Sequence, residues 1–185
     1  MDDAGDPRGL PFGFDGEGTP RAVVTLLDAG VVGGAVTDLG TAASTGTTST
    51  GHAHVAREES PAPVAANLHL RPGTADLDEM LAGIERGVYV QRFWYTRVVD
   101  CAATTLTGVS RDACFLVEDG RLTRPVAGAR FTESVFGVLD RVDLVGTARL
   151  AQPLMNVWNG SVTAPALRVR GFTFGPRATS PGGGS

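Results

Sequence analysis

Two apolar, β-branched segments of this chain are each interrupted by a short acidic turn that ends in glycine. In residues 21–38 the turn is Asp28-Ala29-Gly30, and in residues 113–126 it is Glu118-Asp119-Gly120. Glycine readily adopts the positive φ angles that tight turns between antiparallel strands require. Both segments are therefore predicted to be β-hairpins, which favours an antiparallel sheet.

Glycine and proline are frequent along the whole chain, with 25 and 11 copies in 185 residues. Frequent glycine and proline indicate many turns and short elements rather than a helical bundle. The length fits one domain, expected over residues 12–176, between a disordered segment at 1–11 and a flexible Gly/Ser tail at 177–185. The predicted fold class is α+β and β-rich: a mostly antiparallel sheet or barrel-like domain with two or three short helices.

The clearest helix is predicted over residues 77–86. Asp76 and Glu79 form the pattern of a capping box, apolar side chains recur at helical spacing, and Gly87 follows in the position that commonly ends a helix. A second helix is expected to begin near Thr132. Its inward residues would be Val135, Val138, Leu139 and Val142.

The remaining segments divide into strands and one long loop. Residues 64–70 and 166–174 are predicted to be strands, the second with a possible bulge at Gly171. Residues 41–63 are rich in Thr, Ser, Gly, Ala and Pro without a sustained period, and we interpret them as a loop. Loops of this length in a compact domain are usually functional or disordered.

The charge pattern excludes several classes of function. The net charge is −4, and no basic cluster of the kind that neutralises phosphates is present, so no nucleic-acid partner is expected.

No stretch reaches the length of a membrane span, and no signal peptide is recognised. Cys101 and Cys114 do not make a disulfide framework and are interpreted as structural, which favours a reduced, cytoplasmic location.

Several longer segments match a known family in order and spacing. They are GVYVQRFWYTRVVD (87–100), TLTGVSRDACFLVEDGRLTRPV (105–126) and NVWNGSVTAPALRVRGFTFG (156–175), with FGFDGEGTPRA (12–22) and TTSTGHA (47–53) before them. Together they resemble the C-terminal domain of the TldD/TldE metallopeptidases, also called the PmbA or "modulator of DNA gyrase" family. The resemblance implies a β-rich domain that works within paired subunits on peptides.

The zinc-binding residues of that family are not matched here. The resemblance implies an HExxxH-type helix in an upstream part and a ligand cysteine in the loop before the last strand. This chain has no HExxH or HExxxH motif, and its loop at 156–161 contains no cysteine. We therefore expect no catalytic and no metal-binding residue in this chain, and the closer resemblance is to the metal-free TldE/PmbA type. Zinc is implied only in a TldD-type partner.

The loop at 45–58 is the first candidate for a binding surface. The resemblance places a motif here near the substrate cavity, where Gly51 would permit backbone approach and Thr50, His52 and Arg57 would bind a peptide. The alternative is a flexible, exposed loop. His52 and His54 could also form a two-ligand metal site, against the simpler interpretation of a solvated loop, and His69 is expected to be structural.

Aromatic residues give the second candidate. Phe93, Trp94 and Tyr95 are contiguous, and alternation along a strand would send Phe93 and Tyr95 to one face and Trp94 to the other. One face would belong to the core and the other to an interface or cavity. Asn156 and Trp158, beside the position of the missing cysteine, are further candidates for a cavity.

Two functions remain open at this point. The chain is either the C-terminal domain of a non-zinc, TldE-like subunit, or a stand-alone interaction module or truncated fragment. In the first case it would shape a peptide-binding chamber and a dimer interface, with a TldD-type zinc subunit or a second copy as partner. Peptide would then bind in an extended form through backbone hydrogen bonds.

Overall fold

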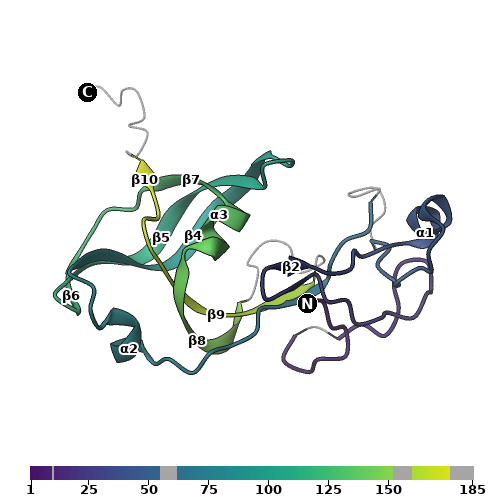
Figure 1. Cartoon of the computed structure of the whole chain (residues 1–185), viewed down its shortest axis with the longest axis horizontal. Helices are drawn as coiled ribbons and strands as arrows, with labels where there is room; N and C mark the ends of the chain where they lie inside the picture. The colour runs from purple at the N-terminus through teal and green to yellow at the C-terminus, as the bar shows by residue number, and fades with distance from the viewer. Residues whose placement is uncertain (10, 55–61, 152–159, 176–185) are drawn as a thin grey trace, which may run out of the picture. The chain divides into compact units, whose positions relative to one another are not determined.

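The computed structural model describes residues 1–9, 11–54, 62–151 and 160–175. Their contacts divide the chain into two compact units: Met1–Gly73 with Thr147–Ala166, and Thr74–Gly146 with Leu167–Ser185. Figure 1 shows the helices and strands along the chain. Each unit is described below by itself.

The first unit contains the predicted hairpin around Asp28. Strand β1 (Leu27–Asp28) pairs antiparallel with β2 (Val31–Val32), and the two turn residues Ala29 and Gly30 have φ angles of 48° and 84°. Two successive positive φ angles define the tight turn whose twist matches that of the strands. The hairpin prediction is confirmed, although the ladder is short.

Part of the segment predicted to be a loop is a helix. α1 (Leu39–Thr45) begins at Asp38, whose carboxylate accepts a hydrogen bond from the backbone N–H of Thr41 at 2.6 Å, and ends at Gly46 with a φ of 67°. Ala42 is its buried residue. The loop prediction was wrong here because the helix has signals at both ends but no apolar stripe between them.

A three-stranded sheet has the order β3-β9-β8. Strand β3 (Asn67–His69) runs parallel to β9 (Ser161–Val169), with Asn67 opposite Ser161, and β8 (Val142–Ala151) is the other neighbour. The strand predicted at 64–70 is therefore present but shorter. Gly160, with a φ of 90°, approaches Ala66 so closely that a Cβ would overlap its carbonyl oxygen.

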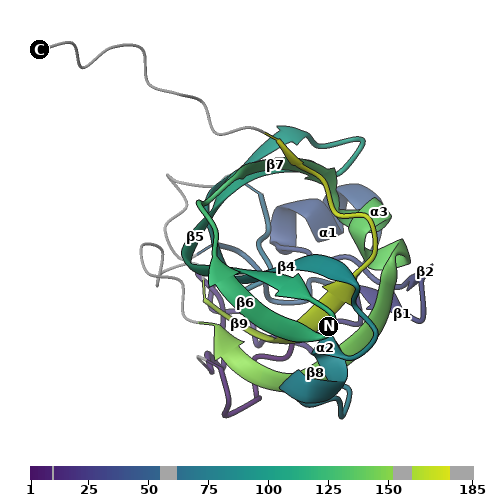
Figure 2. The same ribbon diagram turned by 90° about the vertical axis from the view of Figure 1, so that its left-hand side faces the viewer.

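The second unit contains a five-stranded sheet built on one long antiparallel pair. β4 (Arg86–Asp100) pairs with β5 (Thr105–Glu118), and β5 also pairs with β6 (Arg121–Pro125) and β7 (Arg130–Ser134). The short strand β10 (Phe174–Gly175) lies beyond β7. These strands curve strongly (Figure 2). The sheet is not closed into a barrel, so of the two expected forms the open, mostly antiparallel sheet is correct.

The predicted turn between β5 and β6 is also confirmed. Asp119 and Gly120 have φ angles of 48° and 75°, and Glu118 pairs with Arg121 across the turn. Cys114 is buried within β5, as expected for a core residue, whereas Cys101 is exposed. Both cysteines are free.

Aromatic packing holds one face of the sheet. The ring of Phe93 lies 4.6 Å from that of Phe131 and 5.7 Å from that of Phe172, and Phe174 contacts Phe172. Gly108 lies directly opposite Phe131, and a Cβ at this position would meet the Phe131 ring at 2.7 Å. The absent side chain of Gly108 thus leaves the space that Phe131 fills.

The remaining helices are shorter than expected. α2 (Leu77–Leu81) has the predicted capping box, but Gly83, with a φ of 75°, follows its end and Gly87 lies within β4. α3 (Val135–Asp140) is capped by Ser134, because Thr132 belongs to β7. None of its residues is buried, and Val142 opens β8, so the predicted inward face was wrong. With α1, three helices are present in the described ranges, which confirms the α+β class.

The closing strand also ends early. β9 stops at Val169, and Gly171 adopts a φ of 62° in the turn that follows. This turn separates β9 from β10, so the interruption expected at Gly171 is larger than a bulge.

The capping box gives a test of this local architecture. Asp76→Ala removes the acceptor for the Glu79 backbone N–H, which donates at 2.9 Å, so we expect a loss of about 1 kcal/mol in the free energy of unfolding. Asp78→Ala, in the same exposed first turn, is the control and should cost less than about 0.5 kcal/mol. Urea unfolding followed by circular dichroism measures both, and equal midpoints for the two variants would contradict the capping role.

Candidate functional site

The loop around Thr50 is held by reciprocal hydrogen bonds to Thr37. The Thr37 backbone N–H donates to Thr50 Oγ1 at 2.7 Å, and the Thr50 N–H donates to Thr37 Oγ1 at 3.0 Å. Gly51 follows with a φ of 71°, and a Cβ there would overlap the carbonyl oxygen of Pro20. The backbone N–H and hydroxyl of Thr50, which could otherwise bind a peptide, therefore hold this loop in place. Gly51 lets the loop approach Pro20 closely.

His52 is fully buried beside Asp2. Its Nε2 lies 3.0 Å from Asp2 Oδ1, and its Nδ1 lies 2.8 Å from the carbonyl oxygen of Thr50. An ionised carboxylate can only accept, so Nε2 carries the proton of the bond to Asp2. The interpretation of a solvated loop is wrong for both histidines of this loop, because His54 is buried as well.

Asp2 joins this loop to the strand β3. Its Oδ2 accepts hydrogen bonds from the backbone N–H groups of Ala66 at 2.7 Å and Asn67 at 2.8 Å. Burial opposes ionisation of Asp2, but the hydrogen bonds from His52 and from the two backbone amides outweigh it and lower its pKa. The structure thus differs from the expectation of disorder over 1–11, since Asp2 has no exposed surface.

The buried polar groups extend to β9. Ser161 donates a short hydrogen bond to Asn67 Oδ1, and the backbone of Gly9 approaches both side chains closely. His69 is also buried, with its Nδ1 3.5 Å from Asp6 Oδ2. Both histidines thus lie in the core of the first unit, where His52 is hydrogen-bonded and the ring nitrogens of His69 have no hydrogen-bond partner among the described residues.

Three predicted site residues lie outside the described residues: Arg57, Asn156 and Trp158. Among the residues that are described, no group of three or more His, Cys, Asp and Glu side chains is arranged to hold a metal ion. The binding roles of Thr50, Gly51 and His52 remain predictions.

A β-bulge redirects the aromatic side chains of β4. Tyr95 has a φ of 50°, and the pairing register shifts between Trp94 and Arg97. Because the bulge breaks the alternation, the Tyr95 ring meets the Trp94 ring edge-on at 5.6 Å, whereas Phe93 stays in the aromatic core. The expectation that Phe93 and Tyr95 share a face was therefore wrong.

Two arginines stack over Trp94. The Cζ atoms of Arg92 and Arg111 lie 5.1 Å and 4.7 Å from the centre of the indole ring. Arg92 also forms a 2.5 Å ion pair with Asp112, which has a φ of 65°. The bulges at Tyr95 and Asp112 lie on adjacent strands and flank this group, and residues held at positive φ often cluster at functional sites.

A cavity of about 410 Å³ opens at this group. Its lining consists of two aromatic rings, an arginine and small or apolar residues: Trp94, Tyr95, Val109, Ser110, Arg111 and Gly128. The sequence predicted the aromatic contribution but missed Arg111 and Asp112. The signal available in the sequence was the polar Ser-Arg-Asp interruption of an otherwise apolar strand at 110–112.

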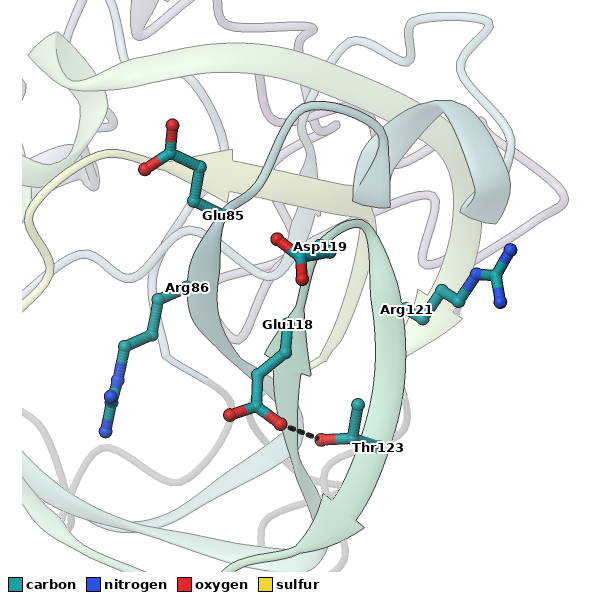
Figure 3. Close-up of a pocket in the computed structure, with 6 residues that line it drawn as sticks. All are labelled: Glu85, Arg86, Glu118, Asp119, Arg121 and Thr123. Atoms are coloured by element: carbon teal, nitrogen blue, oxygen red, sulfur yellow. Dashed lines mark hydrogen bonds between the residues drawn. The ribbon is translucent and has the colours of Figure 1, made fainter.

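A second, more open hollow of about 640 Å³ lies at the end of the β4–β5 pair. Figure 3 shows the carboxylates of Glu85, Glu118 and Asp119 there, with Arg86 and Arg121 extending to opposite sides. Glu118 accepts a hydrogen bond from Thr123 at 2.8 Å. Charges of both signs and wide exposure give this hollow no single ligand preference, so the cavity at Trp94 is the better candidate site.

The buried Asp2 gives a prediction of pH dependence. A lowered pKa means that its ionised form stabilises the fold fully above its ordinary pKa of 3.8 and that this stability is lost as the pH falls through the lowered value. Asp2→Asn should remove this acid dependence and reduce the free energy of unfolding at pH 7 by at least about 1 kcal/mol. Urea titrations from pH 7 to pH 3 measure both effects.

The matched control is Asp28→Asn, which changes an exposed carboxylate on the β1–β2 hairpin of the same unit. It should shift the free energy by less than about 0.5 kcal/mol at every pH. An Asp2→Asn variant with the acid dependence of the unmodified chain would contradict the role assigned to Asp2.

Comparison with known proteins places this geometry in a family. Over residues 1–176 the chain matches the family described as PmbA/TldA metallopeptidase C-terminal domain. A metalloprotease TldD homolog from Haemophilus influenzae is 27% identical over 136 residues, covering 71% of this chain and 27% of that protein. A metalloprotease from Methanothermobacter thermautotrophicus is 28% identical over 136 residues, covering 74% and 30%.

Solved structures agree on the fold. TldE from Thermococcus kodakarensis has a TM-score of 0.74 at 24% identity, over 91% of this chain and 37% of TldE. A Thermotoga maritima protein named as a modulator of a DNA gyrase has a TM-score of 0.71 at 24% identity, over 91% and 36%. No helix in the described residues is long and apolar enough to cross a membrane. The chain spans between 27% and 37% of the length of these four relatives, and it belongs to the PmbA/TldD metallopeptidase family as a C-terminal domain.

Proposed function

We propose that this chain serves as the C-terminal domain of a TldE-like, zinc-free subunit. In this role it forms part of a peptide-binding chamber and of the contact with a partner subunit. A TldD-type partner supplies the zinc ion and the glutamate that activates water, and the complex cleaves small or unfolded peptides.

The residues of this chain support a zinc-free role. A zinc site needs several nitrogen or sulfur donors that converge on one point. Both ring nitrogens of His52 lie within hydrogen-bond distance of oxygen atoms, His69 faces Asp6, and Cys114 is buried within β5. The donors of the described residues do not fit a zinc ion, so no zinc-dependent step is derived for this chain.

The observation that carries the proposed contact is the free edge of β4. This strand of 15 residues lies at the end of the order β10-β7-β5-β4, and no strand among the described residues pairs with its other side. An unprotected edge of this length is a template for pairing with another chain. A partner subunit or an extended peptide would satisfy its backbone groups.

Exposed apolar side chains mark the same strand. Val98 and Val99 expose 61% and 60% of their surface, and Val88, Phe93 and Tyr95 are exposed as well. Several exposed apolar groups on one strand indicate an interaction surface rather than a solvated one. We therefore assign the partner contact to β4.

A matched pair of double variants tests this assignment. Val98→Lys with Val99→Lys places two charges on the β4 edge, whereas Val31→Lys with Val32→Lys places them on the equally exposed hairpin strand β2. Charged residues on an edge strand oppose pairing with another chain. The first variant should lose association with a TldD-type zinc subunit from the same genome, and the second should keep it.

The measurement is size-exclusion chromatography with light scattering of the co-expressed proteins, followed by a zinc-dependent assay on an unfolded peptide. Cleavage that requires the complex, and that is lost with the β4 variant alone, supports the proposal. Absence of a complex with the unmodified chain would overturn the subunit role and leave an independent interaction module. Association that survives the β4 variant would place the contact elsewhere.

A further inference from the structure

Two like charges face each other across the β4–β5 pair. Arg92 lies directly opposite Arg111 in the register, and Trp94 lies opposite Val109 in the next pair on the same face. Like charges in opposed positions are destabilising unless something compensates them. Asp112 is the acidic group that pairs with them, so one positive charge is left over.

The uncompensated charge belongs to Arg111. Asp112 Oδ2 lies 2.5 Å from a terminal nitrogen of Arg92, whereas its Oδ1 lies 3.9 Å from Nε of Arg111, beyond hydrogen-bond distance. No hydrogen bond joins the Arg111 guanidinium to any other residue in the described part of the chain. Its side chain is 51% exposed, so it remains accessible to a ligand.

Stacking leaves the donors of Arg111 available. The guanidinium of Arg111 lies over the Trp94 ring, with 4.7 Å between Cζ and the ring centre. A guanidinium that stacks by its face keeps the N–H groups along its edge free, in the fork geometry that matches a carboxylate. The stack also limits the motion of the side chain, which reduces the entropy lost when a ligand binds.

The cavity surrounds this arginine with apolar walls. Trp94, Tyr95 and Val109 supply the walls, and Arg111 is the charged group among the lining residues. Gly128 also lines the cavity and packs closely on Ser110, because a Cβ there would come within 2.5 Å of the Ser110 carbonyl oxygen. A volume of about 410 Å³ is within the range of small-molecule sites and large enough for an amino-acid residue with an aromatic ring.

We propose that this cavity binds a carboxylate attached to an aromatic or aliphatic body. The carboxylate pairs with the free edge of Arg111, and the apolar body packs between Tyr95 and Val109. The inference rests on the proposed function only in naming a peptide as the carrier of the carboxylate. Within a peptide the carboxylate is either the C-terminal group or an acidic side chain next to an apolar residue.

Isothermal titration calorimetry on the full chain tests the ligand chemistry. The probes are N-acetylphenylalanine, its neutral amide, and inorganic phosphate. We expect the acid to bind at least about tenfold more tightly than the amide, because the amide lacks the charge that pairs with Arg111. Equal binding of acid and amide, no binding of the acid, or phosphate binding as tightly as the acid would overturn the proposal.

A fourth probe distinguishes the two sources of the carboxylate. N-acetyl-aspartyl-phenylalaninamide carries an acidic side chain beside the ring but no free C-terminal carboxylate. Both sources share the chemistry proposed here. Binding of this probe as tight as that of N-acetylphenylalanine assigns the site to acidic side chains as well, and weaker binding assigns it to peptide C-termini.

Variants of the chain test the residues. Arg111→Gln should weaken binding of N-acetylphenylalanine about tenfold or more, whereas Arg124→Gln, an exposed arginine on β6 outside the cavity, should leave it unchanged. Tyr95→Asn removes one wall with a residue that tolerates positive φ, and it should weaken binding several-fold. Unchanged binding by Arg111→Gln, with a native circular dichroism spectrum, contradicts the assignment.

These outcomes are separate from those of the proposed function. The calorimetry requires neither zinc nor a partner subunit. Loss of complex formation with a TldD-type subunit would leave the carboxylate site intact, and failure of N-acetylphenylalanine to bind would leave the subunit role intact.

Discussion

The register of the β4–β5 pair is the constraint on which the second unit depends. This pair aligns Phe93 with the aromatic core on one face and Trp94 with the arginines on the other. A shift of one residue would exchange these faces, which would separate Phe93 from the aromatic core and Trp94 from the arginines. The aromatic cluster and the charged group therefore fix the same register from opposite sides of the sheet.

The first unit depends on buried polar contacts between segments far apart in the sequence. Asp2 connects His52, 50 residues away, with the backbone of β3, and the Asn67–Ser161 bond connects β3 with β9 over 94 residues. Each of these groups would be costly to bury alone, because an unsatisfied polar group loses its hydrogen bonds to water. Their mutual satisfaction explains why a segment rich in Thr, Ser and Gly forms an ordered core.

The sequence predicted features whose causes are local. The two turns that end in glycine and the Asp76–Glu79 capping box are encoded within four residues, and the structure contains both hairpins and the capped start of α2. Helix α1 was missed because its two caps specify it without an apolar face. The partnership of Asp2 with His52 and the cavity at Trp94 could not be predicted, since both arise from register and tertiary contacts that no local pattern encodes.

The strain at the Trp94 cavity argues that its geometry is maintained for a purpose other than stability. Tyr95 and Asp112 both adopt positive φ, at a cost on the order of 1–3 kcal/mol each, and two arginines are held in opposed positions. Stacking on Trp94 and the Asp112 ion pair offset part of this cost, but a glycine at either bulge would relieve the strain directly. Tyr95 instead adds a ring to the cavity wall, and Asp112 engages Arg92 closely while its approach to Arg111, at 3.9 Å, is beyond hydrogen-bond distance. Both strained residues thus keep the cavity apolar on its walls and positively charged at one point.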